Sequence, residues 1–259
     1  MNGDVIQLAY WQVGMAYVFV IVVLIMLRRR GIRRETTLLL ASIRMTLQLV
    51  AVGFVLMAVF GNPHPLITTG IVLLMIGFAV YTLFRKFKRD LSPALRRVIA
   101  ISVPLGTVPV LAFFLWLVIG ITPLYDPQYV IPITGMIVGN SMTGISLGIH
   151  TLVTRFKNNR MEIEEALALG ATPKQASDGI VNDAFDAAIM PTLNSMLGMG
   201  IIFLPGMMTG QILSGVDPTL AILYQIAIML GILGGVSVTT YVFLALGVTT
   251  FFTDQQQLA

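Results

Sequence analysis

The chain has 259 residues, of which 56% are hydrophobic and only 11% are charged. A soluble domain carries about 25% charged residues, so this composition excludes a soluble globular protein and predicts an all-α protein that crosses a membrane several times. There is no cysteine, which excludes disulfides, cysteine zinc sites and iron–sulfur clusters. The basic residues lie beside apolar runs, a pattern typical of membrane topology rather than of nucleic-acid binding.

Seven transmembrane helices are expected, because a span needs about 20 apolar residues. The first span has its arginines behind it, so we expect an uncleaved span and not a signal peptide. The first five spans are predicted at Leu8–Leu27, Thr37–Phe60, Leu66–Leu83, Val98–Ile121 and Val130–Val153.

The sixth span is interrupted by proline, which kinks or breaks a helix. Its segment begins near Ala187 and contains Pro191 and Pro205. Two courses are open: a span Ala187–Leu204 followed by a re-entrant piece, or one broken span Ala187–Leu213. The last span is predicted over Leu220–Phe252, after Asp217-Pro218.

Lys and Arg cluster in three loops, which lie on one side of the membrane if the spans alternate. These loops hold all but one of the sixteen basic residues: Arg28, Arg29, Arg30, Arg33 and Arg34; Arg85, Lys86, Lys88, Arg89, Arg96 and Arg97; Arg155, Lys157, Arg160 and Lys174. The opposite loops, Gly61–Pro65 and Thr122–Gln128, hold none. Because cytoplasmic loops are rich in Lys and Arg, we expect the N-terminus outside and the C-terminus in the cytoplasm.

The cytoplasmic loop of about 155–183 contains the one long, charged segment that could form helices. Its apolar residues Ile163, Ala166, Leu167 and Gly170 share one helix face, with Glu162, Glu164 and Glu165 elsewhere on the helix. Gly170 should end this helix, and Thr172-Pro173, just before Lys174, should start a second one. Such an element between two spans offers a soluble partner a surface to bind; the alternative is an amphipathic helix lying on the membrane.

No phosphate-binding G-x-x-x-x-G-K-[ST] motif occurs, so any ATP hydrolysis must come from another chain. Glu164, Ala166, Leu169, Gly170 and Ala171 resemble the coupling helix of importer-type ABC permeases, although Glu165 stands where that pattern usually has Ala. The segments VIPITGMIVGNSMTGISLG (130–148), LALGATPKQA (167–176) and LPGMMTGQILSGVDP (204–218), with Tyr224-Gln225, resemble the FetB-like permeases.

That family includes bacterial iron-export subunits and plant aluminium-tolerance membrane proteins. The resemblance implies a single permease domain over residues 1–259 in the cytoplasmic (inner) membrane. It further implies a homodimer that works with a separate ABC ATPase, exports iron, and binds no cofactor of its own, since ATP and Mg belong to the ATPase.

Polar residues within the spans are candidates for a substrate path, because lipid offers them no partner. Asn140 and Ser141 in the fifth span lie at a depth similar to that of Asn194 and Ser195 in the sixth. The two pairs could instead hydrogen-bond each other. Methionines crowd the same segments: Met136, Met142, Met190, Met196, Met199, Met207 and Met208. Their thioethers suit soft cations such as Cu(I) but also serve as adaptable packing, so a metal site is left open.

Two further sets of residues are predicted from the sequence to serve substrate entry and helix packing. Arg44, Gln48, Asp183 and Asp186 lie near the cytoplasmic edge, where substrate would come in. Arg44 could instead snorkel to the surface, and the two aspartates could complement the dipole at a helix N-terminus. Small residues four apart allow close helix packing, within one subunit or between two, and occur at Gly135, Gly139, Gly144 and Gly148.

Two other function classes fit the sequence less well. An ion-driven carrier or channel normally uses titratable groups inside its spans, and the expected spans contain no carboxylate. A membrane-embedded enzyme needs an activated nucleophile, but Ser141 and Ser195 have no His or Asp nearby in the expected spans.

The topology can be tested by cysteine labelling, since the chain has no cysteine of its own. We expect Glu165→Cys to be protected from a membrane-impermeant thiol reagent in intact cells and to react after permeabilisation, because the loop faces the cytoplasm. Asp126→Cys, in the opposite loop, should react in intact cells and is the matched control. Labelling of position 165 in intact cells would overturn this topology.

Overall fold

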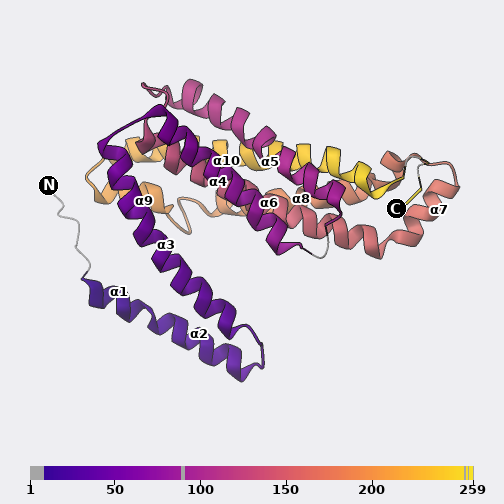
Figure 1. The fold of residues 1–259 in the computed structure, drawn as a ribbon, viewed down its shortest axis with the longest axis horizontal. Helices are drawn as coiled ribbons and strands as arrows, with labels where there is room; N and C mark the ends of the chain where they lie inside the picture. The colour runs from indigo at the N-terminus through magenta and orange to yellow at the C-terminus, as the bar shows by residue number, and fades with distance from the viewer. Residues whose placement is uncertain (1–8, 89–90, 254, 256, 259) are drawn as a thin grey trace. The chain divides into compact units, whose positions relative to one another are not determined.

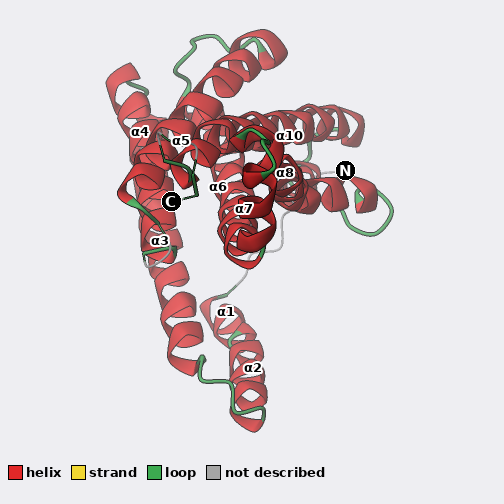
Figure 2. Ribbon diagram, turned by 90° about the vertical axis from the view of Figure 1, so that its right-hand side faces the viewer, coloured by secondary structure: helices red, strands yellow, loops and turns green. Residues whose placement is uncertain are grey.

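The structure, a computed structural model, describes residues 9–88, 91–253, 255, 257 and 258. Within these residues helices are joined by loops, without a strand (Figure 2). Six described helices or helix pairs are long and apolar enough to cross a membrane: Tyr10–Arg29, Glu35–Gly61, Pro65–Lys86, Pro93–Ile119, Pro127–Asn158 and Pro218–Phe251. These findings confirm an all-α, multi-pass membrane protein. Leu8, the predicted first residue of span 1, and Arg89 of the second basic loop lie outside the described residues.

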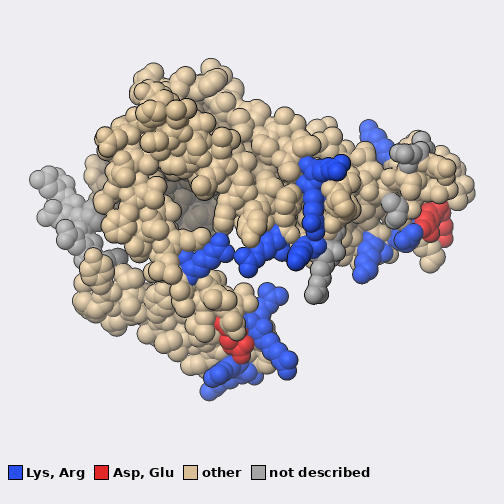
Figure 3. Space-filling view, viewed as in Figure 1, with Lys and Arg blue, Asp and Glu red and all other residues tan. Residues whose placement is uncertain are grey.

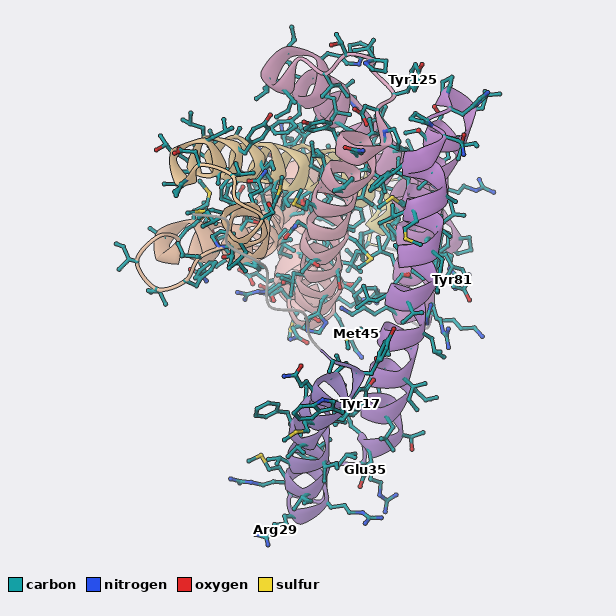
Figure 4. All side chains as sticks on the ribbon, turned by 90° about the vertical axis from the view of Figure 1, so that its left-hand side faces the viewer. Tyr17, Arg29, Glu35, Met45, Tyr81 and Tyr125 are labelled. Atoms are coloured by element: carbon teal, nitrogen blue, oxygen red, sulfur yellow. The ribbon has the colours of Figure 1, made fainter. Side chains whose placement is uncertain are left out.

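The helices form two compact units, the first comprising residues 1–63 and 213–215. In this unit, α1 (Tyr10–Ala16) and α2 (Val18–Arg29) together make the first span, and α3 (Glu35–Gly61) makes the second. Tyr17, between α1 and α2, shares a hydrogen bond with the hydroxyl of Thr46 on α3, and Figure 4 shows its side chain directed toward that helix. This bond satisfies two polar groups inside an apolar hairpin.

The second unit comprises residues 64–212 and 216–259 (Figure 1). Its helices are α4 (Pro65–Lys86), α5 (Pro93–Phe113) continued by the π-helix η1 (Phe114–Ile119), α6 (Pro127–Asn158), α7 (Arg160–Ala168), α8 (Pro173–Gly198), α9 (Gly206–Leu213) and α10 (Pro218–Gly247) continued by the 3-10 helix η2 (Val248–Phe251). Broad areas of the surface carry no charged side chain, as a protein surrounded by lipid requires (Figure 3).

Five helices of the second unit begin with the same two-residue device. A capping side chain accepts a backbone N–H of the first turn, and proline follows at the first helical position, where no N–H is needed. The pairs are His64-Pro65, Ser92-Pro93, Asp126-Pro127, Thr172-Pro173 and Asp217-Pro218. These caps explain why α5 and α8 begin earlier than hydropathy alone indicates.

The core forms where α5, α6, α8 and α10 approach one another closely. A Cβ added to Gly106 of α5 would lie 2.4 Å from the backbone Cα of Thr239 on α10. A Cβ on Gly144 of α6 would lie 2.7 Å from Val236 of α10 and 3.2 Å from the Ala188 carbonyl of α8. Small residues therefore set these interhelical distances.

The four predicted packing glycines do not behave alike. Gly144 and Gly148 face α8 and α10 of the same chain, since Cβ atoms there would contact Ala188 and Ala184 respectively. Gly135 would meet only the Met75 side chain of α4, and nothing lies within 4 Å of a Cβ at Gly139. Of the four, Gly144 is therefore the one that the neighbouring helices approach most closely, whereas a Cβ at Gly148 would be in ordinary contact, 3.6 Å from the Ala184 carbonyl.

The predicted sixth span differs from the structure in its course. Helix α8 runs from Pro173 to Gly198, so it begins well before Ala187 and contains Pro191 without ending there. The chain then turns through 199–205 and forms the short helix α9. The continuous span Ala187–Leu204 is therefore not formed, and the segment is broken, with Pro205 just before α9. Helix α8 is absent from the six span candidates, because its first half is polar.

The close contact at Gly106 predicts that Gly106→Ala will destabilise the protein by about 1–3 kcal/mol through overpacking. The measurement is thermal or denaturant unfolding of the purified protein in detergent. Gly77→Ala on α4 is the control, because nothing lies within 4 Å of a Cβ there; Ala is the better helix former, so that variant should be as stable as the wild type or more so. Equal stability of the two variants would contradict the packing described here.

Candidate coupling element and membrane path

Residues 155–183 form an elbow at one end of the second unit: the end of α6, the short helix α7, a tight turn and the start of α8 (Figure 1). The predicted helix–turn–helix is confirmed in its order and in its turn residues. Gly170 has φ +92°, and the N–H of Ala171 bonds the Ala166 carbonyl at 3.0 Å, which is the Schellman ending of a helix. Thr172 and Gln175 then cap α8 reciprocally, with Thr172 N donating to Gln175 Oε1 at 2.9 Å.

The elbow is anchored to the membrane-spanning helices through its apolar face. Ile163 is 2% exposed and belongs to the same buried cluster as Phe156 of α6 and Ile180 of α8. Leu167 packs against that cluster. A cavity of about 400 Å³ lies inside the bend, lined by residues of α6, α7 and α8, with Ala166 and Asp183 among them. Any force on α7 is therefore passed directly to α6 and α8.

The outward face of the elbow presents apolar side chains to solvent. Leu169, at the turn, is 89% exposed, and Met161, at the start of α7, is 71% exposed. The sequence placed Leu169 in the coupling-helix pattern without predicting its exposure, and it did not indicate Met161. The exposure of Leu169 and Met161 could have been predicted from their positions, because both lie outside the helix face formed by Ile163, Ala166 and Leu167. An apolar tip on an otherwise polar loop is typical of a protein-binding surface.

The three glutamates of the elbow differ in their surroundings. Glu162 accepts a hydrogen bond from the Asn159 amide at 2.8 Å, and Glu164 pairs with Arg160 at 2.8 Å. Both of these contacts lie within α7 and its cap. Glu165 is exposed, and its carboxylate forms no ion pair or hydrogen bond with the described residues, so its charge is available to a partner. Lys174 is exposed and lines a cavity of about 940 Å³ between the start of α8 and the end of α10.

The proposed path residues fall on two different faces of α6. Asn140 is exposed, with its amide bonded to the Met136 carbonyl of its own helix at 2.7 Å. Ser141 is fully buried, and its hydroxyl has no partner among the described residues. A Cβ on Gly235 of α10 would lie 3.3 Å from that hydroxyl, so Ser141 faces α10.

The α8 pair lies at nearly the same depth as Asn140. Gly144 is opposite Ala188 and Gly148 is opposite Ala184, so the two helices are antiparallel and Asn140 is level with about residue 192. Asn194 is exposed, within about one turn of that level. Ser195 donates to the Pro191 carbonyl of its own helix at 2.9 Å. The side chains of Asn140 and Ser195 therefore form hydrogen bonds within their own helices. Among the described residues, no hydrogen bond joins the two Asn-Ser pairs.

Exposed polar residues continue along the same side of α6. Thr143, His150 and Thr154 follow Asn140 at intervals of three, seven and four residues, and all are exposed. This row, Asn140–Thr143–His150–Thr154, is called the polar face of α6 below. It runs from the middle of the helix toward the elbow.

The methionines mostly fill space between helices. Met136, Met196, Met199 and Met207 pack against one apolar cluster, and Met142 packs against the other. Met208 is buried, and Met190 is 39% exposed. The Gln225 amide of α10 lies 4.0 Å from the Met199 sulfur. Among the described residues, no three His, Asp or Glu side chains come close enough to hold a metal ion.

The four residues assigned to the cytoplasmic mouth of the path are divided. Asp183 pairs with Arg155 of α6 at 2.8 Å, and both side chains are 49% exposed. Asp186 is exposed one turn further along α8. Arg44 and Gln48 are exposed on α3, in the first unit. The alternative role for Asp183 and Asp186 at a helix N-terminus is wrong, because α8 begins at Pro173 and has no acidic residue in its first turn.

Comparison with known proteins places the chain in a family. Residues 10–252 match the family described as "Uncharacterised protein family (UPF0014)". The chain belongs to this family. Its members include a protein of Escherichia coli K12 named "Probable iron export permease protein FetB", 33% identical over 95% of this chain and 93% of that protein.

Two further members come from distant organisms. "UPF0014 membrane protein YjkA" of Bacillus subtilis is 33% identical over 96% of this chain and 98% of its own length. "Protein ALUMINUM SENSITIVE 3" of Arabidopsis thaliana is 33% identical over 94% of this chain and 87% of its own length. No solved structure matches the chain. The resemblance inferred from the segments after Val130 is thereby confirmed for nearly the whole chain.

Proposed function

We propose that the chain is the membrane-spanning permease subunit of an ABC transporter, driven by a separate ATPase subunit. The elbow carries this proposal. It joins two long helices through a capped turn, it is anchored by the buried Ile163, and it presents the 89% exposed Leu169 to solvent. An exposed apolar tip beside the free carboxylate of Glu165 suits insertion into a cleft of a soluble partner.

The substrate path lies, in this proposal, along the Asn140–Thr143 end of the polar face of α6. The Asn140 side-chain oxygen receives no hydrogen bond from the described residues, although the residue is exposed in the middle of a 32-residue helix. Lipid cannot supply a donor at that depth. A second copy of the chain facing this side would close a polar path between two α6 helices, which makes the active unit a homodimer in the cytoplasmic membrane.

The substrate proposed is a metal ion, most directly iron leaving the cytosol. Support for iron comes from the name of the Escherichia coli relative. Asn140, Thr143 and Asn194 offer a hard cation only neutral oxygen ligands, so they do not by themselves select iron. The Arabidopsis relative is named for aluminium sensitivity, so a permease of the same design with another substrate is the alternative. ATP and Mg are bound by the ATPase subunit in either case.

The coupling role predicts that Gly170→Leu will abolish transport and substrate-stimulated ATP hydrolysis, while the protein still inserts into the membrane. Leu is strained at φ +92°, so the turn must change shape. Leu169→Glu should act at the same place without backbone strain, by putting a charge into the apolar contact. The measurement is reconstitution with the candidate ATPase, testing which metals stimulate ATP hydrolysis and are transported.

The matched control for these variants is Gly179→Ala, because nothing lies within 4 Å of a Cβ at Gly179 and its backbone is helical. This variant should couple like the wild type. Full transport by Gly170→Leu and Leu169→Glu, or failure of the purified chain to bind any ATPase, would count against the permease proposal.

The proposed homodimer predicts that Thr143→Cys will form a disulfide between two copies in native membranes under mild oxidation. A residue close to a two-fold axis meets its own copy, and disulfide formation requires Cα atoms within about 7 Å. Leu117→Cys is the control, since Leu117 is 73% exposed on η1, away from α6. Cross-linking at 117 but not at 143 would show that copies meet through another face.

A further inference from the structure

A small cavity with basic walls lies where α4 ends against the last turns of α6. Its volume is about 310 Å³, and it is lined by Phe87, His150, Val153, Thr154, Lys157 and Asn158. None of these six residues is acidic. Glu162 and the Arg155–Asp183 ion pair line the separate cavity inside the bend, so the two cavities are distinct, although Lys157 and Asn158 belong to the end of α6 that begins the elbow.

The cavity has a positively charged rim and an apolar floor. Phe87, at the end of α4, is 7% exposed and provides the floor together with Val153. Lys86 reaches across from α4 to bond the Ser146 hydroxyl of α6, and its ammonium lies 5.5 Å from the Phe87 ring centroid. Ser146, His150 and Lys157 follow one another along α6 in steps of four and seven residues, so Lys86, bonded to Ser146, and Lys157 lie along the same side of α6 as His150.

The hydrogen-bond donors that line the cavity can bind a ligand. Within the described residues, the Lys157 ammonium forms no ion pair and no hydrogen bond. The Thr154 hydroxyl and the Asn158 side-chain amide likewise form no hydrogen bond with the described residues. A cation, a hydroxyl and an amide facing one cavity whose described lining residues include no carboxylate make a site for an anion with several oxygen atoms, such as a phosphate group.

The position of the cavity identifies the source of that phosphate. Helix α4 has 22 residues and is therefore about 33 Å long, close to the hydrocarbon thickness of about 30 Å. It ends in Arg85 and Lys86, which mark the boundary between lipid and water on the side of the basic loops. A cavity at this level lies beside the headgroups of the leaflet, and its apolar floor fits the glycerol region below a headgroup.

We propose that this cavity binds the phosphate headgroup of an anionic phospholipid. Lys157 and Lys86 supply the charge, and the side chains of Thr154, Asn158 and His150 supply N–H and O–H donors to the phosphate oxygens. The acyl chains remain in the bilayer against the outer surface of α4 and α6. The lipid thereby joins the end of α4 to the part of α6 that leads into the elbow. This assignment does not depend on which substrate the protein carries.

The test compares lipids bound to the purified full-length chain. The protein is placed in nanodiscs of phosphatidylcholine with or without phosphatidylglycerol, and retained lipids are counted by native mass spectrometry after release. We expect the wild type to retain phosphatidylglycerol selectively. Lys157→Gln should lower its affinity about tenfold, the cost of a lost charged hydrogen bond. Thr154→Val, which keeps the shape of the side chain, should weaken retention less.

Arg97→Gln is the matched control. Arg97 is an exposed basic residue near the start of α5, on the same side as the basic loops, but it does not line the cavity. It should retain phosphatidylglycerol like the wild type, and the melting temperatures of all variants in phosphatidylcholine alone report whether they fold. Equal retention of the two lipids, or equal loss in Arg97→Gln and Lys157→Gln, would overturn the proposal. So would full competition by soluble glycerol phosphate, which would make this a site for a free phosphate compound.

Discussion

The second unit depends on the close contact between α10 and its neighbours α5 and α6. Without a hydrophobic driving force between helices in lipid, association rests on van der Waals packing, and small residues allow the closest approach. Gly106 of α5 meets the backbone at Thr239, and Gly235 of α10 would bring a Cβ within 2.7 Å of Ile137 on α6. The three helices are thereby held at a distance that no larger residue permits. The polar face of α6 and the part of the elbow formed by α6 therefore lie on a helix that this packing holds in place.

The sequence predicted the features that depend on local chemistry. Hydropathy located the spans, and Gly170 with Thr172-Pro173 located the turn of the elbow, because positive φ and helix capping each require particular residues. The continuity of the helix that starts at Pro173 with the sixth span was not predicted, because hydropathy detects only the apolar half of α8, which begins near Ala187. Pro191 gave a misleading signal, since a proline inside a membrane helix can be tolerated when its neighbours satisfy the freed carbonyl.

Side-chain surroundings could not be predicted from the sequence to the same degree. Asn140 and Ser141 are adjacent in the chain, yet one is exposed and the other is fully buried against α10, because successive helical residues are about 100° apart. The exposure of Leu169 depends on the direction in which the turn leaves α7, and this follows from the backbone geometry at Gly170. The basic cavity requires α4 and α6 to be neighbours, a contact that no local pattern reveals.

The continuity of α8 has a mechanical consequence. The helix starts in the capped turn of the elbow and ends at Gly198, beyond Asn194, so that its 26 residues span about 39 Å as one helix, with the i→i−4 hydrogen bond missing only at Pro191. A rod of that length that pivots near its capped end by about 5° moves its far end sideways by about 3 Å. A slight rocking of α8 at the elbow is therefore enough to shift Asn194 and its neighbours at the far end of the helix by about 3 Å.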